Sequence, residues 1–167
     1  MLKITKISGN IFDDIELKKR FEDLDKHGKC ERLKVSRQEL EKIRLRKNTD
    51  MGTDVGLSFD DGTRIRHGDV IMAEEKFILV EQLPEKVISI KVKQSLNQTE
   101  LLVLLGHIIG NRHRPISIEN QTITFPIQAD SELELFKNLF SETTKDLDMK
   151  VEERVFVPRK GMDVHEH

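Results

Sequence analysis

The sequence is poor in several residue types, and each shortage excludes something. Among its 167 residues it has no tryptophan, no tyrosine and a single cysteine, Cys30. One cysteine can form neither an internal disulfide nor a cysteine-based metal cluster. The longest apolar run is far too short to cross a membrane, and the start, Met1 to Ile7, is amphipathic and unlike a signal peptide. We therefore expect a protein of the reducing cytoplasm that does not contact a membrane.

An excess of charge of one sign is also missing. Charged residues make up 35% of the chain, yet the formal net charge is only -2. A protein that binds nucleic acid through its phosphates carries a clear basic excess. The balance of charges therefore argues against a nucleic-acid partner.

What the sequence does have is one strongly apolar stretch, Leu101 to Pro115. Asn97 and Glu100 have the spacing of a capping pair, which predicts that a helix starts there. Gly110 and Asn111 both tolerate a positive φ, which predicts that the helix ends at them. The proline that closes the stretch forbids continuation. We expect a buried helix that ends in a rigid turn.

His113 is expected on that exit turn. Neutral imidazole is a good ligand for zinc, copper and nickel, but one histidine does not hold a metal well. His107 is a poor partner, because six residues place it roughly 120° away around a helix; a core or interface histidine with a satisfied hydrogen bond is the simpler interpretation. The spacing alone does not distinguish a metal ligand from an ordinary surface histidine at position 113.

The first half of the chain consists of short apolar pieces separated by turn residues. Asp60-Asp61-Gly62 has hairpin chemistry, and the densely charged residues 13–47 are expected to form mainly a solvated face. The alternation of apolar and polar residues predicts a small all-β unit over residues 1–82. Its expected strands cover residues 2–5, 40–46, 57–59, 70–71 and 77–80.

The pattern changes after a plausible linker at residues 82–86. A strand, the apolar helix, two strands, a second helix and a last strand follow over residues 86–157. Ser131 and Glu134 have capping-box spacing at the start of the second helix. This β-α-β-β-α-β order is the ferredoxin-like arrangement, so the chain as a whole is predicted to be α+β. The expected strands cover residues 88–92, 116–118, 123–127 and 151–157.

Residues 158–167 are expected to be a mobile tail. Side chains alternate along an extended chain, so His165 and His167 project to the same side and both imidazoles can reach one ion. A terminal His-x-His is weak evidence by itself, because it is also compatible with the remnant of an affinity tag.

Gly110-Asn111-Arg112-His113 after an apolar helix resembles the signature of the urease accessory protein E family, the nickel metallochaperones of urease maturation. The resemblance covers nearly the whole chain. Residues that resemble the family's first domain are Arg44-Leu45-Arg46, Thr49, Gly52, Val55-Gly56-Leu57 and Gly68-Asp69-Val70.

The resemblance implies a β-rich peptide-binding domain, then a ferredoxin-like domain that binds metal and forms a homodimer. It implies that His113 lies at the dimer axis and binds nickel with its symmetry mate, a contact that a twofold axis permits. His165 or His167 then adds auxiliary ligands. The implied function is not enzymatic: nickel is captured and delivered, with the urease accessory GTPase and apo-urease as partners. Zinc or copper is expected to bind in vitro, because imidazole suits all three metals.

The sequence departs from some family members, and other functions stay open. Some members carry a histidine pair where this chain has residues 124–128, which points to few metal ions per dimer. The strand order is also that of an RNA-binding sheet, but Phe125 is the only candidate for stacking. A small enzyme, or a peptide-binding adaptor in which His113 is incidental, are further alternatives. His27 and His67 are expected on the surface, and nothing joins Cys30 as a soft ligand.

Overall fold

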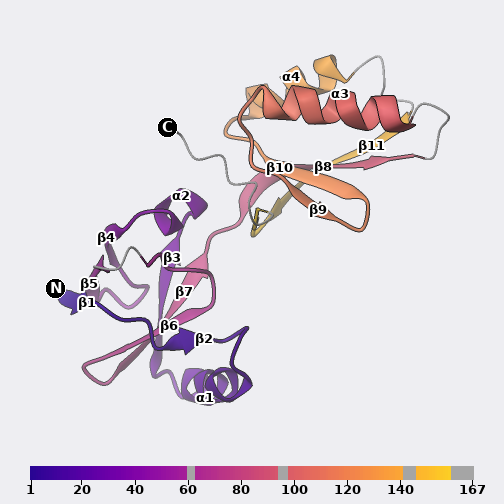
Figure 1. The fold of residues 1–167 in the computed structure, drawn as a ribbon. Helices are drawn as coiled ribbons and strands as arrows, with labels where there is room; N and C mark the ends of the chain where they lie inside the picture. The colour runs from indigo at the N-terminus through magenta and orange to yellow at the C-terminus, as the bar shows by residue number, and fades with distance from the viewer. Residues whose placement is uncertain (60–62, 94–97, 141–145, 159–167) are drawn as a thin grey trace. The chain divides into compact units, whose positions relative to one another are not determined.

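A computed structural model describes residues 1–59, 63–93, 98–140 and 146–158 (Figure 1). The chain divides into two compact units, Met1–Leu83 and Pro84–His167. Both units combine sheets with helices, so the predicted α+β class is confirmed. Within the described ranges, no helix has the length and apolar character needed to span a membrane.

The first unit contains two sheets that enclose its main core. One sheet has the order β1-β5-β4, with β1 parallel to β5; the other has the order β2-β6-β7-β3, with β3 parallel to β7. Alternating side chains such as Val55 and Leu57 of β5 point inward, as expected for strands with one buried face. The bounds are β1 Leu2–Ile4, β2 Gly9–Asn10, β3 Cys30–Val35, β4 Arg44–Asn48, β5 Asp54–Ser58, β6 Asp69–Ala73 and β7 Lys76–Gln82.

The first unit is not all-β, which corrects the prediction for residues 1–82. The charged stretch contains a helix, α1 (Ile15–Lys26), which begins where the Asp14 carboxylate accepts hydrogen bonds from the amides of Glu16 and Leu17. Phe21 is the buried residue of its inner face.

A second, short helix explains why the strand expected at residues 40–46 starts late. Ser36 and Glu39 form a capping box that begins α2 (Arg37–Leu40), so β4 starts only at Arg44. The hairpin residues 60–62 lie outside the described residues.

Two turns of the first unit are built from residues that carry the family resemblance. Gly68 has a φ of 86°, and a Cβ there would lie 2.4 Å from the Phe12 ring, so only glycine fits. Asp69, which is 2% exposed, accepts hydrogen bonds from the Arg66 amide and from Asn10 Nδ2. These contacts fix the entry to β6.

The second turn joins β4 to β5 and is tied to β3. Thr49 Oγ1 donates a hydrogen bond to the Glu31 carboxylate, and Lys76 Nζ donates another. The donor and acceptor atoms are 2.5 Å apart in both hydrogen bonds. Burial alone would raise the pKa of Glu31, but the hydrogen bonds from Lys76, Thr49 and Thr53 outweigh it and hold the pKa below its ordinary value. Glu31 is thus a buried charge with its partners in place.

The second unit has the ferredoxin-like order that the sequence predicts. Its sheet runs β11-β8-β10-β9, all neighbours antiparallel, and α3 and α4 cover one face (Figure 1). The core lies between that face and the two helices, where Leu105 of α3 and Phe136 of α4 meet Phe125 of β10 and Ile90 of β8. The bounds are β8 Glu85–Val92, α3 Gln98–Gly110, β9 Ser117–Glu119, β10 Thr122–Pro126, α4 Asp130–Leu139 and β11 Leu147–Arg154.

Three boundaries of the second unit differ from expectation. Only Leu83 and Pro84 separate β7 from β8, where a five-residue linker was expected. The last strand ends at Arg154 rather than at residue 157. The capping box predicted from Ser131 is wrong, because α4 already begins after Ala129, whose side chain makes no capping hydrogen bond. Asn97 of the other predicted cap lies outside the described residues.

Candidate metal centre

The end of α3 is the feature that places His113. The His113 amide donates to the Gly110 carbonyl at 2.9 Å and the Arg114 amide to the Ile109 carbonyl at 3.5 Å. These are the two reversed hydrogen bonds of a Schellman motif, which requires a left-handed residue just past the helix. That residue is His113 itself, with a φ of 50°. The expectation of a positive φ at Gly110 or Asn111 is therefore wrong: Gly110 is still helical.

A left-handed histidine is a costly choice at this position. A residue with a Cβ pays on the order of 1 kcal/mol relative to glycine there. Non-glycine residues in such strained conformations cluster at functional sites. Glu74, Glu75, Asn120 and Gln121 also have a positive φ, but in the tight turns between β6 and β7 and between β9 and β10. At the end of α3 the conformation fixes the direction of the His113 side chain, which is exposed there.

The surroundings of His113 limit what one chain can hold. Across the described ranges, no group of three or more histidine, cysteine or acidic side chains could enclose a metal ion. One imidazole at an exposed turn therefore needs ligands from another source. The predicted auxiliary ligands His165 and His167 lie outside the described residues.

The other histidines and the cysteine are engaged elsewhere. Asn111 Nδ2 donates to His107 Nε2 at 3.0 Å, and His27 Nδ1 donates to the Asp23 carbonyl. The half-buried His67 accepts a hydrogen bond from the Gln82 amide. Cys30 is 5% exposed, and burial raises the pKa of its thiol, which disfavours the thiolate that metals bind.

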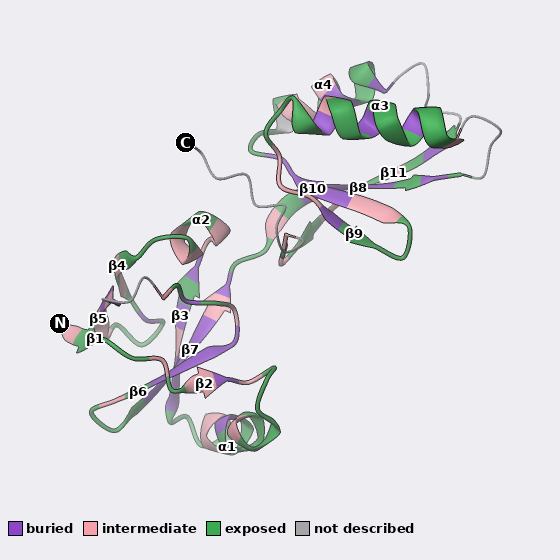
Figure 2. Ribbon diagram, viewed as in Figure 1, coloured by how far each residue is buried: buried purple, intermediate pink, exposed green. Residues whose placement is uncertain are grey.

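The outer face of α3 is exposed (Figure 2). Its apolar part consists of Leu102, Val103, Leu104, Gly106 and Gly110, and the polar residues Thr99, Glu100 and His107 are exposed beside it. Val103 at its centre is 68% exposed, and both glycines have open space where a Cβ would stand. Water does not favour such a face, which is typical of a helix that packs against a partner.

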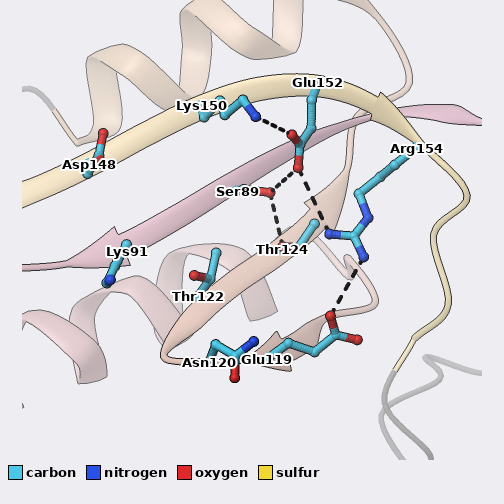
Figure 3. Close-up of a pocket in the computed structure, with 10 residues that line it drawn as sticks. All are labelled: Ser89, Lys91, Glu119, Asn120, Thr122, Thr124, Asp148, Lys150, Glu152 and Arg154. Atoms are coloured by element: carbon cyan, nitrogen blue, oxygen red, sulfur yellow. Dashed lines mark hydrogen bonds and ion pairs between the residues drawn. The ribbon is translucent and has the colours of Figure 1, made fainter.

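The opposite face of the sheet in the second unit tests the RNA-binding alternative. It contains a shallow hollow of about 340 Å³, and none of the described residues that line it is aromatic (Figure 3). Four of its six charged residues are paired within the face: Glu152 accepts from Lys150 and Ser89, and Arg154 bridges Glu152 and Glu119. Bases would find no ring to stack on and few free cations. This face therefore does not favour RNA binding.

Known proteins with similar sequences indicate the family of this chain. Residues 4–81 match the family model described as "UreE urease accessory protein, N-terminal domain". The urease accessory protein UreE of Lysinibacillus sphaericus is 31% identical over 121 residues, which cover 72% of this chain and 74% of that protein. The chain belongs to the UreE urease accessory protein family.

Other UreE proteins match over similar lengths. The UreE of Natronomonas pharaonis is 30% identical over 78% of this chain, and UreE 1 of Pseudomonas syringae pv. tomato is 27% identical over 76%. The match spans 61% of the first protein and 84% of the second. Since the family model covers the first unit, the tetrapeptide that ends at His113 lies beyond it, in the second unit.

Two features of the site were not foreseen from the sequence. One is the exposed apolar face of α3. The sequence does contain a signal for it, because the apolar residues Leu101 to Leu105 surround the helix on all sides. Such a helix is typically covered on more than one face. The other is Glu132 of α4, which ion-pairs with Arg114 next to His113. No local spacing indicates that pair, because 18 residues separate its members.

Proposed function

We propose that this chain is a nickel metallochaperone that captures nickel and delivers it for assembly of the urease metallocentre. The observation that carries the proposal is His113: an exposed imidazole, held in a costly left-handed conformation, in a member of the UreE family. Nickel is the cargo, and no bond-breaking chemistry is involved. The names of the relatives, which are urease accessory proteins, support the link to urease.

A homodimer through the second unit would supply the missing ligand. A twofold axis near the end of α3 brings His113 of one copy to His113 of the other, because such contacts are isologous. The outer face of α3 is the apolar surface that a second copy can cover, and it ends beside His113. Two imidazoles per ion follow from one histidine per chain.

His165 and His167 are proposed as auxiliary ligands from the tail of one or both copies. Water would fill the other coordination positions of the ion. An open, water-completed site suits a carrier, since a closed site with four protein ligands would release its ion too slowly. The recipients we propose are the urease accessory GTPase and the apo-urease complex, in the cytoplasm.

A nickel titration by calorimetry tests this proposal. The parent chain should bind nickel with half an ion per chain at its main site, and His113→Ala should lose that site. Deleting residues 162–167 should only weaken binding. His27→Ala is the matched control, because His27 is also an exposed histidine near a helix end. If His113→Ala binds nickel as the parent does, the proposal is wrong.

The pH dependence of binding is a second test. Ligand imidazoles must be unprotonated, so nickel affinity should fall as the pH drops through about 6.5, the ordinary histidine value. Affinity that stays constant from pH 8 to pH 5 would indicate carboxylate ligands and contradict the histidine site.

A further inference from the structure

We propose that Arg114 and Glu132 form a clamp that positions His113 for the metal. The inference rests on the proposed function of His113 and adds two positioning residues to it. Neither residue would touch the ion. They act by holding the turn that carries the ligand.

The clamp joins the turn after α3 to the first turn of α4. Glu132 Oε1 accepts from Arg114 Nη2, and Glu132 Oε2 accepts from the Gln128 amide at 3.0 Å. The Arg114 and Glu132 side chains are only 14% and 21% exposed. The carboxylate thus ties the residue beside His113 to the neighbouring helix in a mostly desolvated contact, where such pairs are strongest.

The backbone hydrogen bond of Arg114 is the weakest one in this turn, whereas that of His113 has an ordinary length of 2.9 Å. The Arg114 amide lies 3.5 Å from the Ile109 carbonyl, at the outer limit of a hydrogen bond. His113 is also in a conformation that a side chain disfavours. The ion pair adds a side-chain contact at Arg114, where the backbone contact is weakest.

Removal of the carboxylate would leave Arg114 poorly satisfied. Among the residues that the structure describes, none offers an acceptor to the buried Nε of Arg114. A mostly buried guanidinium without its carboxylate is destabilising. The turn would then move so that Arg114 reaches water, and His113 would move with it.

Such movement would weaken metal binding without removing a ligand. Apparent affinity falls by the fraction of molecules in which the ligand is in place. An ion shared by two copies needs both ligands in place, so this fraction enters the affinity twice. A roughly threefold fall in the fraction of correctly placed His113 in each copy therefore lowers the affinity about tenfold.

The test compares Glu132→Gln with Glu134→Gln in the full-length chain. Both variants remove one negative charge from α4, but Glu134 pairs with Lys137 on the exposed side of the helix. Arg114→Lys is a second clamp variant, which keeps the charge and loses the planar fork. Two quantities are measured: amide hydrogen exchange of His113 and Arg114 in the metal-free protein, and nickel affinity by calorimetry.

In the clamp variants we expect exchange at these two amides to speed up about fivefold while α3 core amides stay unchanged. Nickel binding should weaken about tenfold, and Glu134→Gln should match the parent in both. Unchanged exchange overturns the clamp. Faster exchange with unchanged affinity overturns its positioning role and leaves nickel binding by His113 intact. The proposed function would be overturned as well only if His113→Ala bound nickel with the same affinity as the parent.

Discussion

The two long helices, α1 of the first unit and α3 of the second, end in the same motif with different residues. After α1, the Gly28 amide donates to Asp25 and the Lys29 amide to Leu24, with Gly28 at a φ of 66°. After α3, the same pair of bonds forms with His113 in the left-handed position. Glycine is the residue that this position favours. Of the two helices, only α3 has a residue other than glycine in this left-handed position.

The outer faces of the two helices differ in the same way. Beyond Ile15 at its start, the exposed side chains of α1 are polar or charged. The exposed side chains of α3 include Leu102, Val103 and Leu104 besides Thr99, Glu100 and His107. A charged outer face suits water, and an apolar one suits a partner. The outer face of α1 suits water, whereas α3 has the exposed apolar side chains and the left-handed end on which the proposed dimer depends.

The strongest way to break this comparison is a charge on the outer face of α3. Val103→Lys should weaken the homodimer at least about 100-fold, because a desolvated ammonium without a partner costs several kcal/mol. Ile15→Lys is the matched control, since it changes an exposed apolar residue of α1 and should leave association unchanged. Sedimentation equilibrium measures both. Equal association of the two variants would mean that the face of α3 is not the dimer contact.

Acid should act on the first unit through Glu31. Its pKa is held below the ordinary value of 4.5, so its stabilising contribution is present above that value and is lost as the pH falls below it. Glu31→Gln should lower the free energy of unfolding by about 1–2 kcal/mol at pH 7, a range reduced because Lys76 is partly exposed.

Urea denaturation at pH 7 and pH 4 measures this effect. The difference between parent and Glu31→Gln should shrink at the lower pH. A difference that stays constant would show that the carboxylate contributes nothing as a charge.

Exchanging the two helix ends should have the smallest effect. His113→Gly should raise the free energy of unfolding by about 1 kcal/mol, because it removes the strain of a Cβ, and Gly28→Ala should lower it by a similar amount. Thermal unfolding of the metal-free protein measures both. If His113→Gly lowers the free energy of unfolding, contacts of the His113 side chain outweigh the strain of its left-handed conformation.

Much of the second unit could be predicted because its signals are local. Alternating apolar residues give β8 and β10, and the apolar run that stops before Pro115 gives α3 and its exit turn. The left-handed residue could not be predicted correctly. Propensity favours Gly110, but α3 continues through it and the left-handed position falls on His113.

The first unit was predicted less well because charge hides its helix. Leu17, Phe21 and Leu24 have helical spacing after Asp14, a capping residue, but the many charged residues between them suggested only a solvated face. Of the three metal ligands predicted from the sequence, only His113 lies within the described residues, and its role stays a prediction. The contact of Arg114 with Glu132 could not be predicted, because 18 residues separate them and no local pattern indicates such a pair.

Native mass spectrometry of the nickel-loaded protein shows whether two copies of His113 share one ion. We expect a dimer that carries one tightly bound nickel ion for every two chains. The dimer of His113→Ala should carry none, because that variant keeps the outer face of α3 and loses the shared ligand. Nickel bound to single chains, or retained in the His113→Ala dimer, would mean that the ion is not held between two copies of His113.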